Sequence, residues 1–393
     1  MVIGIDASRA NRDKKTGVEW YSYCLIQELK KIIPENIGVI LYTDKPLNGE
    51  LAKLPPNWQE KILKWPFNYF WTQGRLSLEI LFNPPDILFI PSSAIPFICP
   101  KIVFTTIHDV GFKKLPRCYS LLERIYLDWS TKFAIKKCVK IFVPSEFTKK
   151  ELINYFKVDE NKVVVAPLAP VNVPTIGDDT KLDFEKFDFN SEFILFIGRP
   201  TPKKNILRII EAFKLFKREN PDSKFKLVLV GCERGKIVGA SEETSDILKL
   251  DWLSPKEVSF LLEKAKAFIF PSLYEGFGLP ILEAFAARVP VITSRGIATE
   301  EITRLRSNSV EASAGQAPKD KLNFHTGQAQ YAALLVNPLS VIEIKEAIFK
   351  VVSDENLRQD LIEKGKERLK DFSWQKTTKI TWEQMWNCRR YDK

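Results

Sequence analysis

Two glutamates lie eight residues apart in the stretch "YEGFGLPILEAFAARVPVIT", residues 274–293. Glu275 falls on a predicted turn after a buried strand, and Glu283 falls in the first turns of the helix that follows. Gly276 and Gly278 let the backbone approach a ligand closely, and the N-terminus of the helix favours an anion. The stretch predicts a ligand site in which the two carboxylates face different parts of one ligand. A helix cap with one exposed glutamate is the alternative.

A second candidate site is the basic stretch "GRPTPKKN", residues 198–205, which follows the apolar strand pattern "FILFI". Arginine suits bidentate contact with a phosphate, and lysine acts as a point charge. Because Arg199 and Lys204 stand between a strand end and the start of a helix, the pair predicts a clamp for a diphosphate. A solvated basic turn is the alternative.

The N-terminal half offers two weaker candidates. His108 ends the strand pattern "KIVFTTIHDV", where a histidine can contact a ligand or transfer a proton. Asp109 beside it either orients the ring or caps the turn. Gly17 lies in "DKKTGVEWY", which predicts a short basic loop between a strand and a helix and a second anion contact.

The elements that position these residues alternate between short apolar strands and amphipathic helices, which implies βαβ units and parallel sheets. A chain of 393 residues is too long for one typical core. The pattern predicts a Rossmann-like α/β domain at 1–175, a polar linker at 176–191 and a second Rossmann-like α/β domain at 192–372. A polar insertion interrupts the second domain at about 303–328. The helix at 373–393 is expected to pack back on the first domain.

Composition narrows the class of protein. An apolar content of 45% and a charged content of 27% are typical of a soluble globular chain, and no window has the roughly 18 uncharged apolar residues of a membrane span. We expect no signal peptide, because the first strand pattern follows Met1 directly. Six cysteines without a CxxC pair and two histidines predict free thiols and no metal site. The net charge of +10 suits anionic lipid or phosphorylated substrates, and no nucleic-acid signature accompanies it.

Several stretches together resemble the GT4-type retaining glycosyltransferases, which have the GT-B fold. The resemblance spans nearly the whole chain and rests on "PSLYEGFGLPILEAFA", "GRPTPKKN", "TIHDVGF", "VPSEFTKKEL", "TGVEWY" and "FSW". It implies an α/β protein of two Rossmann-like domains whose parallel sheets face across an interdomain cleft. The N-terminal domain would bind the acceptor and the C-terminal domain the nucleotide sugar. The implied reaction moves a hexose, with mannose favoured, from a UDP- or GDP-linked sugar to a saccharide or lipid-linked glycan. Its biological setting would be surface polysaccharide biosynthesis.

The resemblance also assigns roles to residues. Arg199 and Lys204 would hold the diphosphate, Glu275 would contact hydroxyls of the transferred sugar, and His108 would contact that sugar from the N-terminal domain. Glu283 would accept hydrogen bonds from the ribose hydroxyls. The remaining donor contacts would come from Gly17, from the backbone of Gly276, Phe277, Gly278 and Leu279, and from Trp252 and Leu253 beside the base. No metal or other cofactor is implied.

The sequence departs from the family pattern at Arg288, where a small residue is usual, and in "SRGIATEEI", where Glu301 takes the acidic position without the usual proline. Two alternatives stay open: a phosphorylase or epimerase of the same fold, and a non-catalytic basic protein with a vestigial donor site. The basic, aromatic segment at 112–140 suggests a peripheral contact with the inner face of a membrane, with an ordinary surface helix as the alternative. The expected location is the cytoplasm.

Overall fold

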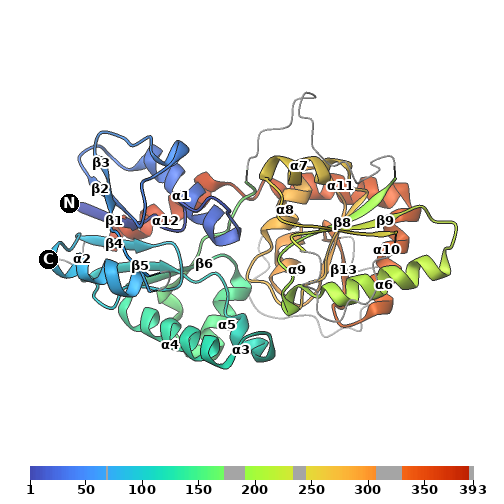
Figure 1. Cartoon of the computed structure of the whole chain (residues 1–393), viewed down its shortest axis with the longest axis horizontal. Helices are drawn as coiled ribbons and strands as arrows, with labels where there is room; N and C mark the ends of the chain where they lie inside the picture. The colour runs from blue at the N-terminus through green and yellow to red at the C-terminus, as the bar shows by residue number, and fades with distance from the viewer. Residues whose placement is uncertain (68–69, 172–190, 233–244, 307–329, 389–393) are drawn as a thin grey trace. The chain divides into compact units, whose positions relative to one another are not determined.

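The computed structural model of the chain is shown in Figure 1 and describes residues 1–67, 70–171, 191–232, 245–306 and 330–388. The chain forms two compact units: unit 1 comprises 1–171 together with 372–393, and unit 2 comprises 172–371. Nearly all of the predicted linker at 176–191 and most of the predicted insertion at 303–328 lie outside the described residues.

Unit 1 contains a sheet of seven parallel strands in the order β3-β2-β1-β4-β5-β6-β7. The strands are β1 (Val2–Asp6), β2 (Gly38–Thr43), β3 (Trp58–Ile62), β4 (Ile87–Ile90), β5 (Ile102–Thr106), β6 (Lys140–Val143) and β7 (Val163–Val165). The chain builds outward from β1 to β3 and then returns to the other side of β1 with β4. Ligands of open parallel sheets bind outside the carboxyl ends of the strands at such a switch point.

The helices of unit 1 are α1 (Gly17–Ile32), α2 (Ser77–Phe82), α3 (Gly111–Lys114), α4 (Leu121–Lys137), α5 (Glu146–Phe156) and α12 (Trp374–Cys388). Helix α1 begins where the Glu19 carboxylate accepts a hydrogen bond from the backbone N–H of Thr16, at 3.1 Å. Because Thr16 is the N-cap, Gly17 is the first residue of α1 and not part of the preceding loop. Ser145 caps α5, as its sequence pattern predicts, by accepting from the backbone N–H of Thr148 at 3.0 Å.

Helix α12 ends the described chain and packs within unit 1. The indole N–H of Trp374 donates to the carbonyl of Pro170 at 2.9 Å, and the Thr377 hydroxyl donates to the carbonyl of Pro167. The Trp374 ring also lies 6.1 Å from the Tyr21 ring of α1. The last helix thus belongs to the same compact unit as the N-terminal sheet.

Unit 2 contains six parallel strands in the order β10-β9-β8-β11-β12-β13. The strands are β8 (Phe193–Ile197), β9 (Lys226–Val230), β10 (Ile247–Leu250), β11 (Ala267–Phe270), β12 (Val291–Ser294) and β13 (Ala333–Val336). The helices are α6 (Ile206–Glu219), α7 (Pro255–Lys264), α8 (Leu279–Ala286), α9 (Ala298–Thr303), α10 (Val341–Ser353) and α11 (Glu355–Leu369). The strand order reverses between β8 and β11, which makes their carboxyl ends the switch point of this sheet.

Arg288, the departure from the family pattern, follows the end of α8 in a left-handed conformation with φ of 57°. A side chain with a Cβ in that conformation costs roughly 1 kcal/mol relative to glycine. The small residue usual at this position therefore has a backbone reason. The Arg288 side chain is exposed, and no contact with another described residue explains the choice of arginine.

Candidate active site

The loops after β8 and β11 form the candidate site of unit 2. The two strands are neighbours in the sheet, so the loops that leave their carboxyl ends start side by side. The backbone N–H of Leu273, on the β11 loop, donates to the carbonyl of Lys203, on the β8 loop, at 2.7 Å. This bond joins the stretch "GRPTPKKN" to the stretch that carries Glu275.

The central contact of the site is an ion pair between these two loops. The Lys204 ammonium donates to Glu275 Oε1 at 2.7 Å, and the two side chains are only 16% and 12% exposed. The same ammonium lies 4.4 Å from the centre of the Phe270 ring, a distance suited to a cation–π contact. Sequence reasoning gave Lys204 and Glu275 separate roles and did not predict that they pair.

Asn205 holds the lysine loop in place. It is buried, adopts a left-handed conformation with φ of 63°, and donates through Nδ2 to the carbonyls of Pro271 at 2.9 Å and Pro338 at 2.6 Å. Since Pro271 follows β11 directly, the side chain of Asn205 fixes the two loops to one another. Such support keeps the position of Lys204 defined before a ligand binds.

Arg199 lies at the same edge of the sheet, directly after Gly198, and its side chain is exposed. A close backbone approach sets the course of this loop. Gly231, after β9, has φ of 81°, and a Cβ there would lie 2.8 Å from the carbonyl oxygen of Gly198. The loop thus presents one exposed and one mostly buried cation at the end of β8.

Helix α8 carries the second glutamate. Its N-cap, Gly278, has φ of 119°, and a Cβ there would meet Ile281 Cδ1 and Thr299 Cγ2 at 3.2 Å each. The backbone itself therefore requires this glycine. Glu283 lies on α8 with its side chain partly accessible, and burial raises the pKa of its carboxyl to about 7. Near neutral pH such a carboxyl exists in both protonation states, and both can hydrogen-bond to hydroxyl groups.

The large side chains that flank Glu275 and lead into α8 are buried. Tyr274 is 0% exposed, Phe277 is 5% exposed and Leu279 is 7% exposed. Gly276 has no side chain to present. This stretch therefore offers its backbone to a ligand, as expected for a loop that leads into a helix N-terminus.

Trp252 and Leu253 follow the edge strand β10, and Trp252 is 45% exposed. They precede α7, which Ser254 caps by accepting from the backbone N–H of Glu257 at 3.4 Å. In the sheet, β10 stands two strands from β8, a separation of about 10 Å at the usual strand spacing. An aromatic ring there suits a group joined to a phosphate at Arg199 or Lys204 through a short linker.

In unit 1, His108 follows β5 and is held by β4. Its Nε2 atom lies 3.0 Å from the carbonyl oxygen of Pro91, and its ring meets the Tyr21 ring edge-on with centroids 4.8 Å apart. Burial lowers the pKa of His108, against the opposing effects of its hydrogen bond to Pro91 and the nearby carboxylates, so the ring is neutral at neutral pH. Asp109 accepts from the backbone N–H of Gly111 at 3.0 Å and so caps the turn.

Gly17 stands beside open space. A Cβ added there would meet no atom within 4 Å, and its backbone is not in the left-handed region. Neither the packing nor the backbone of the described structure therefore requires a glycine at this position. A ligand that approaches the start of α1 closely would explain it.

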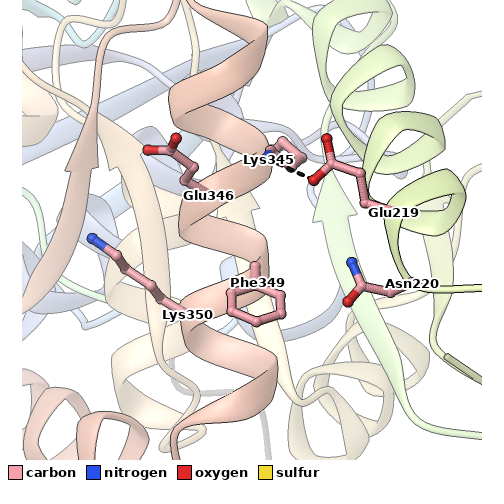
Figure 2. Close-up of a pocket in the computed structure, with 6 residues that line it drawn as sticks. All are labelled: Glu219, Asn220, Lys345, Glu346, Phe349 and Lys350. Carbon is pink, nitrogen blue, oxygen red and sulfur yellow. Dashed lines mark hydrogen bonds and ion pairs between the residues drawn. The ribbon is translucent and has the colours of Figure 1, made fainter.

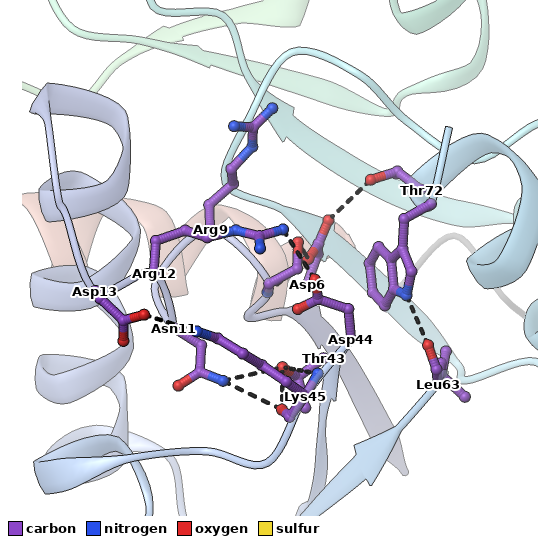
Figure 3. A network of polar contacts seen from close by, with 12 residues as sticks. Asp6, Arg9, Asn11, Arg12, Asp13, Thr43, Asp44, Lys45, Leu63 and Thr72 are labelled. Atoms are coloured by element: carbon purple, nitrogen blue, oxygen red, sulfur yellow. Dashed lines mark hydrogen bonds and ion pairs between the residues drawn. The ribbon is translucent and has the colours of Figure 1, made fainter. Parts of the chain in front are cut away.

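A polar network at the end of β1, shown in Figure 3, escaped sequence reasoning. Asp6 Oδ1 accepts from the backbone and hydroxyl of Ser8 at 2.9 and 2.6 Å, and burial raises the pKa of the Asp6 carboxyl. Arg12 pairs with Asp44 at 2.9 Å, beside the end of β2. These contacts fix the loop between β1 and α1 at the switch point of unit 1. The signal in the sequence was a polar cluster directly after the strand "VIGID".

A groove on unit 2, drawn in Figure 2, lies between the end of α6 and α10. Lys345 crosses it to pair with Glu219 at 2.8 Å. Glu219 ends α6, the helix that leads from the carboxyl end of β8 back toward the start of β9. The groove is therefore near the amino ends of the strands, and none of the predicted site residues lines it.

Comparison with known proteins identifies the family. The profile "Glycosyltransferase Family 4" matches residues 15–169 and the profile "Glycosyl transferases group 1" matches residues 179–311, together more than half of the chain. The chain is similar to O-antigen chain mannosyltransferase B of Escherichia coli, at 26% identity over 70% of this chain and 68% of that protein. It is also similar to O-antigen chain mannosyltransferase RfbU of Salmonella typhimurium, at 25% identity over 59% of this chain and 62% of that protein.

The fold has a close counterpart among solved structures. Sucrose-phosphate synthase from Thermosynechococcus elongatus matches all of this chain and all of its own with a TM-score of 0.71 at 16% identity. The predicted GT-B architecture of two Rossmann-like α/β domains is thereby confirmed. The matches to both profiles, the relatives and the fold agree: the chain belongs to the GT4-type glycosyltransferases of the GT-B fold, and it is a glycosyltransferase.

Proposed function

We propose that this protein is a retaining transferase that moves a hexose, with mannose favoured, from a nucleotide-diphosphate sugar to a saccharide or lipid-linked glycan. The setting is surface polysaccharide biosynthesis. The observation that carries the proposal is the Lys204–Glu275 pair at the switch point of unit 2, with the exposed Arg199 on the same loop as Lys204. The two cationic side chains, Arg199 and Lys204, suit a diphosphate. The two carboxyls, Glu275 and Glu283, suit the hydroxyl groups of the two sugars that this diphosphate links.

The chemistry follows from the charges. When the bond between the anomeric carbon and the diphosphate oxygen breaks, negative charge develops on the leaving phosphate. Arg199 and Lys204 stabilise that charge most effectively where water is largely excluded. The acceptor oxygen bonds to the anomeric carbon from the side that the phosphate leaves, and its proton passes to the phosphate. This route retains the configuration and requires no protein nucleophile. We propose no metal or other cofactor.

The two glutamates then bind hydroxyl groups at different places on one donor. Glu275 contacts the transferred sugar beside Lys204. Glu283, on α8, accepts hydrogen bonds from the ribose. The base lies near Trp252 and Leu253, about 10 Å from the loop after β8 that binds the diphosphate. The neutral His108 serves as a hydrogen-bonding group for the sugar, and Gly17 leaves room for acceptor and phosphate.

The named functions of the relatives support a mannosyl donor. Both O-antigen relatives are named as mannosyltransferases, and a GDP-linked mannose is therefore the first donor to test. A UDP-linked hexose is the second. We place the enzyme in the cytoplasm, with a peripheral contact at the inner face of the membrane. No helix in the described part of the chain is long and apolar enough to cross a bilayer.

A screen of nucleotide sugars by thermal unfolding tests the donor. A ligand at about 100 times its Kd adds roughly 2.7 kcal/mol to the stability of the native state, so GDP-mannose should raise Tm by several degrees. The Arg199→Ala variant should lose that rise while keeping the Tm of the ligand-free protein, because Arg199 is exposed. If no nucleotide sugar raises Tm, or if the variant responds as the wild type does, the proposed donor site is wrong.

A further inference from the structure

Helix α4 of unit 1 carries large apolar side chains that face solvent. Leu122 is 80% exposed, Ile125 is 57% exposed and Trp129 is 42% exposed. Their spacing of three and four residues places them on one face of the helix. Figure 1 shows α4 on the outside of unit 1. The exposure of these three side chains means that this face of α4 is not buried in the core of that unit.

Aromatic contacts extend this face to two other segments. Phe97, which is 51% exposed, lies 5.6 Å from the Trp129 ring, and Trp129 stacks on Phe133 at 5.5 Å. At the other end, Phe70 is 62% exposed and lies 6.3 Å from Tyr126 of α4. The exposed residues Phe70, Phe97, Leu122, Ile125 and Trp129 are called the apolar patch below.

Helix α2 also carries exposed apolar side chains. Its first residue, Ser77, accepts a hydrogen bond from the backbone N–H of Phe97 at 2.8 Å, which fixes Phe97 against the helix. Leu78, Leu81 and Phe82 of α2 are 47%, 51% and 75% exposed. Large apolar side chains exposed in this number are uncommon on a monomeric protein and indicate an interaction site.

The charge around the apolar patch is basic. Residues 97–137 contain eight lysines and arginines and three aspartates and glutamates. Two of the three acids, both on α4, already have partners nearby. Asp128 pairs with Lys113 of α3 and with Lys132, and Glu123 accepts a hydrogen bond from the backbone N–H of Ser120 at the helix start. Lys136 is exposed and lies eleven positions after Ile125, which places it on the same face of α4 as the apolar patch, where it meets little opposing charge.

This combination points to one occupant. Aromatic and aliphatic side chains on one face, flanked by basic residues, are the pattern of a surface that lies in the interface of an anionic bilayer. Tryptophan suits that depth, and long basic side chains reach the lipid headgroups from it. A docked protein or second copy would cover apolar area without needing the excess of positive charge.

We propose that the apolar patch docks unit 1 on an anionic lipid bilayer. This surface deepens the proposed function, since it rests on the peripheral membrane contact included there and identifies the residues and the class of lipid. Docking there would also bring unit 1 to the bilayer surface, where a lipid-linked acceptor lies.

Co-sedimentation of the full chain with vesicles tests this surface without donor or acceptor. Vesicles of phosphatidylcholine alone are compared with vesicles that also contain phosphatidylglycerol, at low and high salt. The triple variant Leu122→Gln/Ile125→Gln/Trp129→Gln should bind the anionic vesicles more than about tenfold more weakly, because it loses most of the apolar contact. The variant Lys136→Gln should bind about fivefold more weakly at low salt. The matched control Ile342→Gln/Phe349→Gln on α10 of unit 2, whose residues are 52% and 47% exposed, should bind as wild type.

Three results would overturn the proposal: equal binding to both vesicle types, an equal loss in the α10 control, or self-association of the wild type in sedimentation velocity that the triple variant abolishes. The last result would make the patch an interface between chains. Since all changed side chains are exposed, each variant should keep its Tm and its response to nucleotide sugars. That response separates a failure of the membrane surface from a failure of the glycosyltransferase proposal.

Discussion

Replacing Lys204 with Met should lower kcat by roughly 10²–10³-fold, because the change removes a cation that stabilises developing negative charge in a site shielded from water. Acceptor-dependent release of nucleoside diphosphate measures the rate. The matched control is Lys266→Met. Its ion pair with Glu192 measures 2.9 Å but is 34% and 53% exposed, so turnover should stay close to the wild-type value.

The same variant has a predictable effect on stability. Lys204 and Glu275 are mostly buried, so removal of the lysine leaves a carboxylate without its partner. We expect a loss of about 1–3 kcal/mol. In the double variant Lys204→Met/Glu275→Gln much of that stability should return, because the uncompensated charge is gone, while turnover stays low. Wild-type turnover in Lys204→Met would remove this pair from the mechanism.

Replacing Glu283 with Gln should separate stability from donor binding. We expect donor affinity to fall by about 10-fold to 10²-fold, because each hydrogen bond to a charged group contributes roughly 1.5–3 kcal/mol. In the donor-free protein, by contrast, the variant should be more stable than the wild type at alkaline pH. Titration with the donor found in the screen measures the first effect, and thermal unfolding measures the second.

The direction of the pH effect follows from the pKa of Glu283. Burial raises it from 4.5 to about 7, so between those pH values the folded protein holds a proton that the unfolded chain has released. Stability therefore falls as pH rises through this window, and the full penalty applies above pH 7. Glutamine carries no such penalty, so the variant should gain about 2–3 kcal/mol at alkaline pH and far less in acid. An equal gain at both pH values would contradict the assigned cause, and the exposed Glu346→Gln serves as control.

The sequence patterns predicted the central strands of both sheets and missed three edge strands, β3 in unit 1 and both β10 and β13 in unit 2. Central strands such as β8 are buried on both faces and form continuous apolar runs. The edge strand β3, "WQEKI", has mostly exposed or partly exposed side chains, so it shows no such run. The edge strand β10, "ILKL", is buried only at its first residue. Edge strands are recognised by the neighbour that they pair with, which a local pattern does not reveal.

The candidate site shows the same division between local and long-range information. Glu275 and Lys204 were each identified from their own stretch, because turns after strands and helix starts have local signals. Their pairing joins residues 71 positions apart, and it depends on β11 lying beside β8 in the sheet. Asp6 was missed because an aspartate at the end of a strand resembles any turn residue until its burial is known.

The stereochemistry of the product tests the central claim most directly. The donor identified by the thermal screen is incubated with the enzyme and a saccharide acceptor, and NMR of the product reports the anomeric configuration of the new bond. If the leaving phosphate takes the acceptor proton on the face that it leaves, as proposed, an α-linked donor gives an α-linked product. A β-linked product would contradict the account, since inversion requires attack from the opposite face of the sugar.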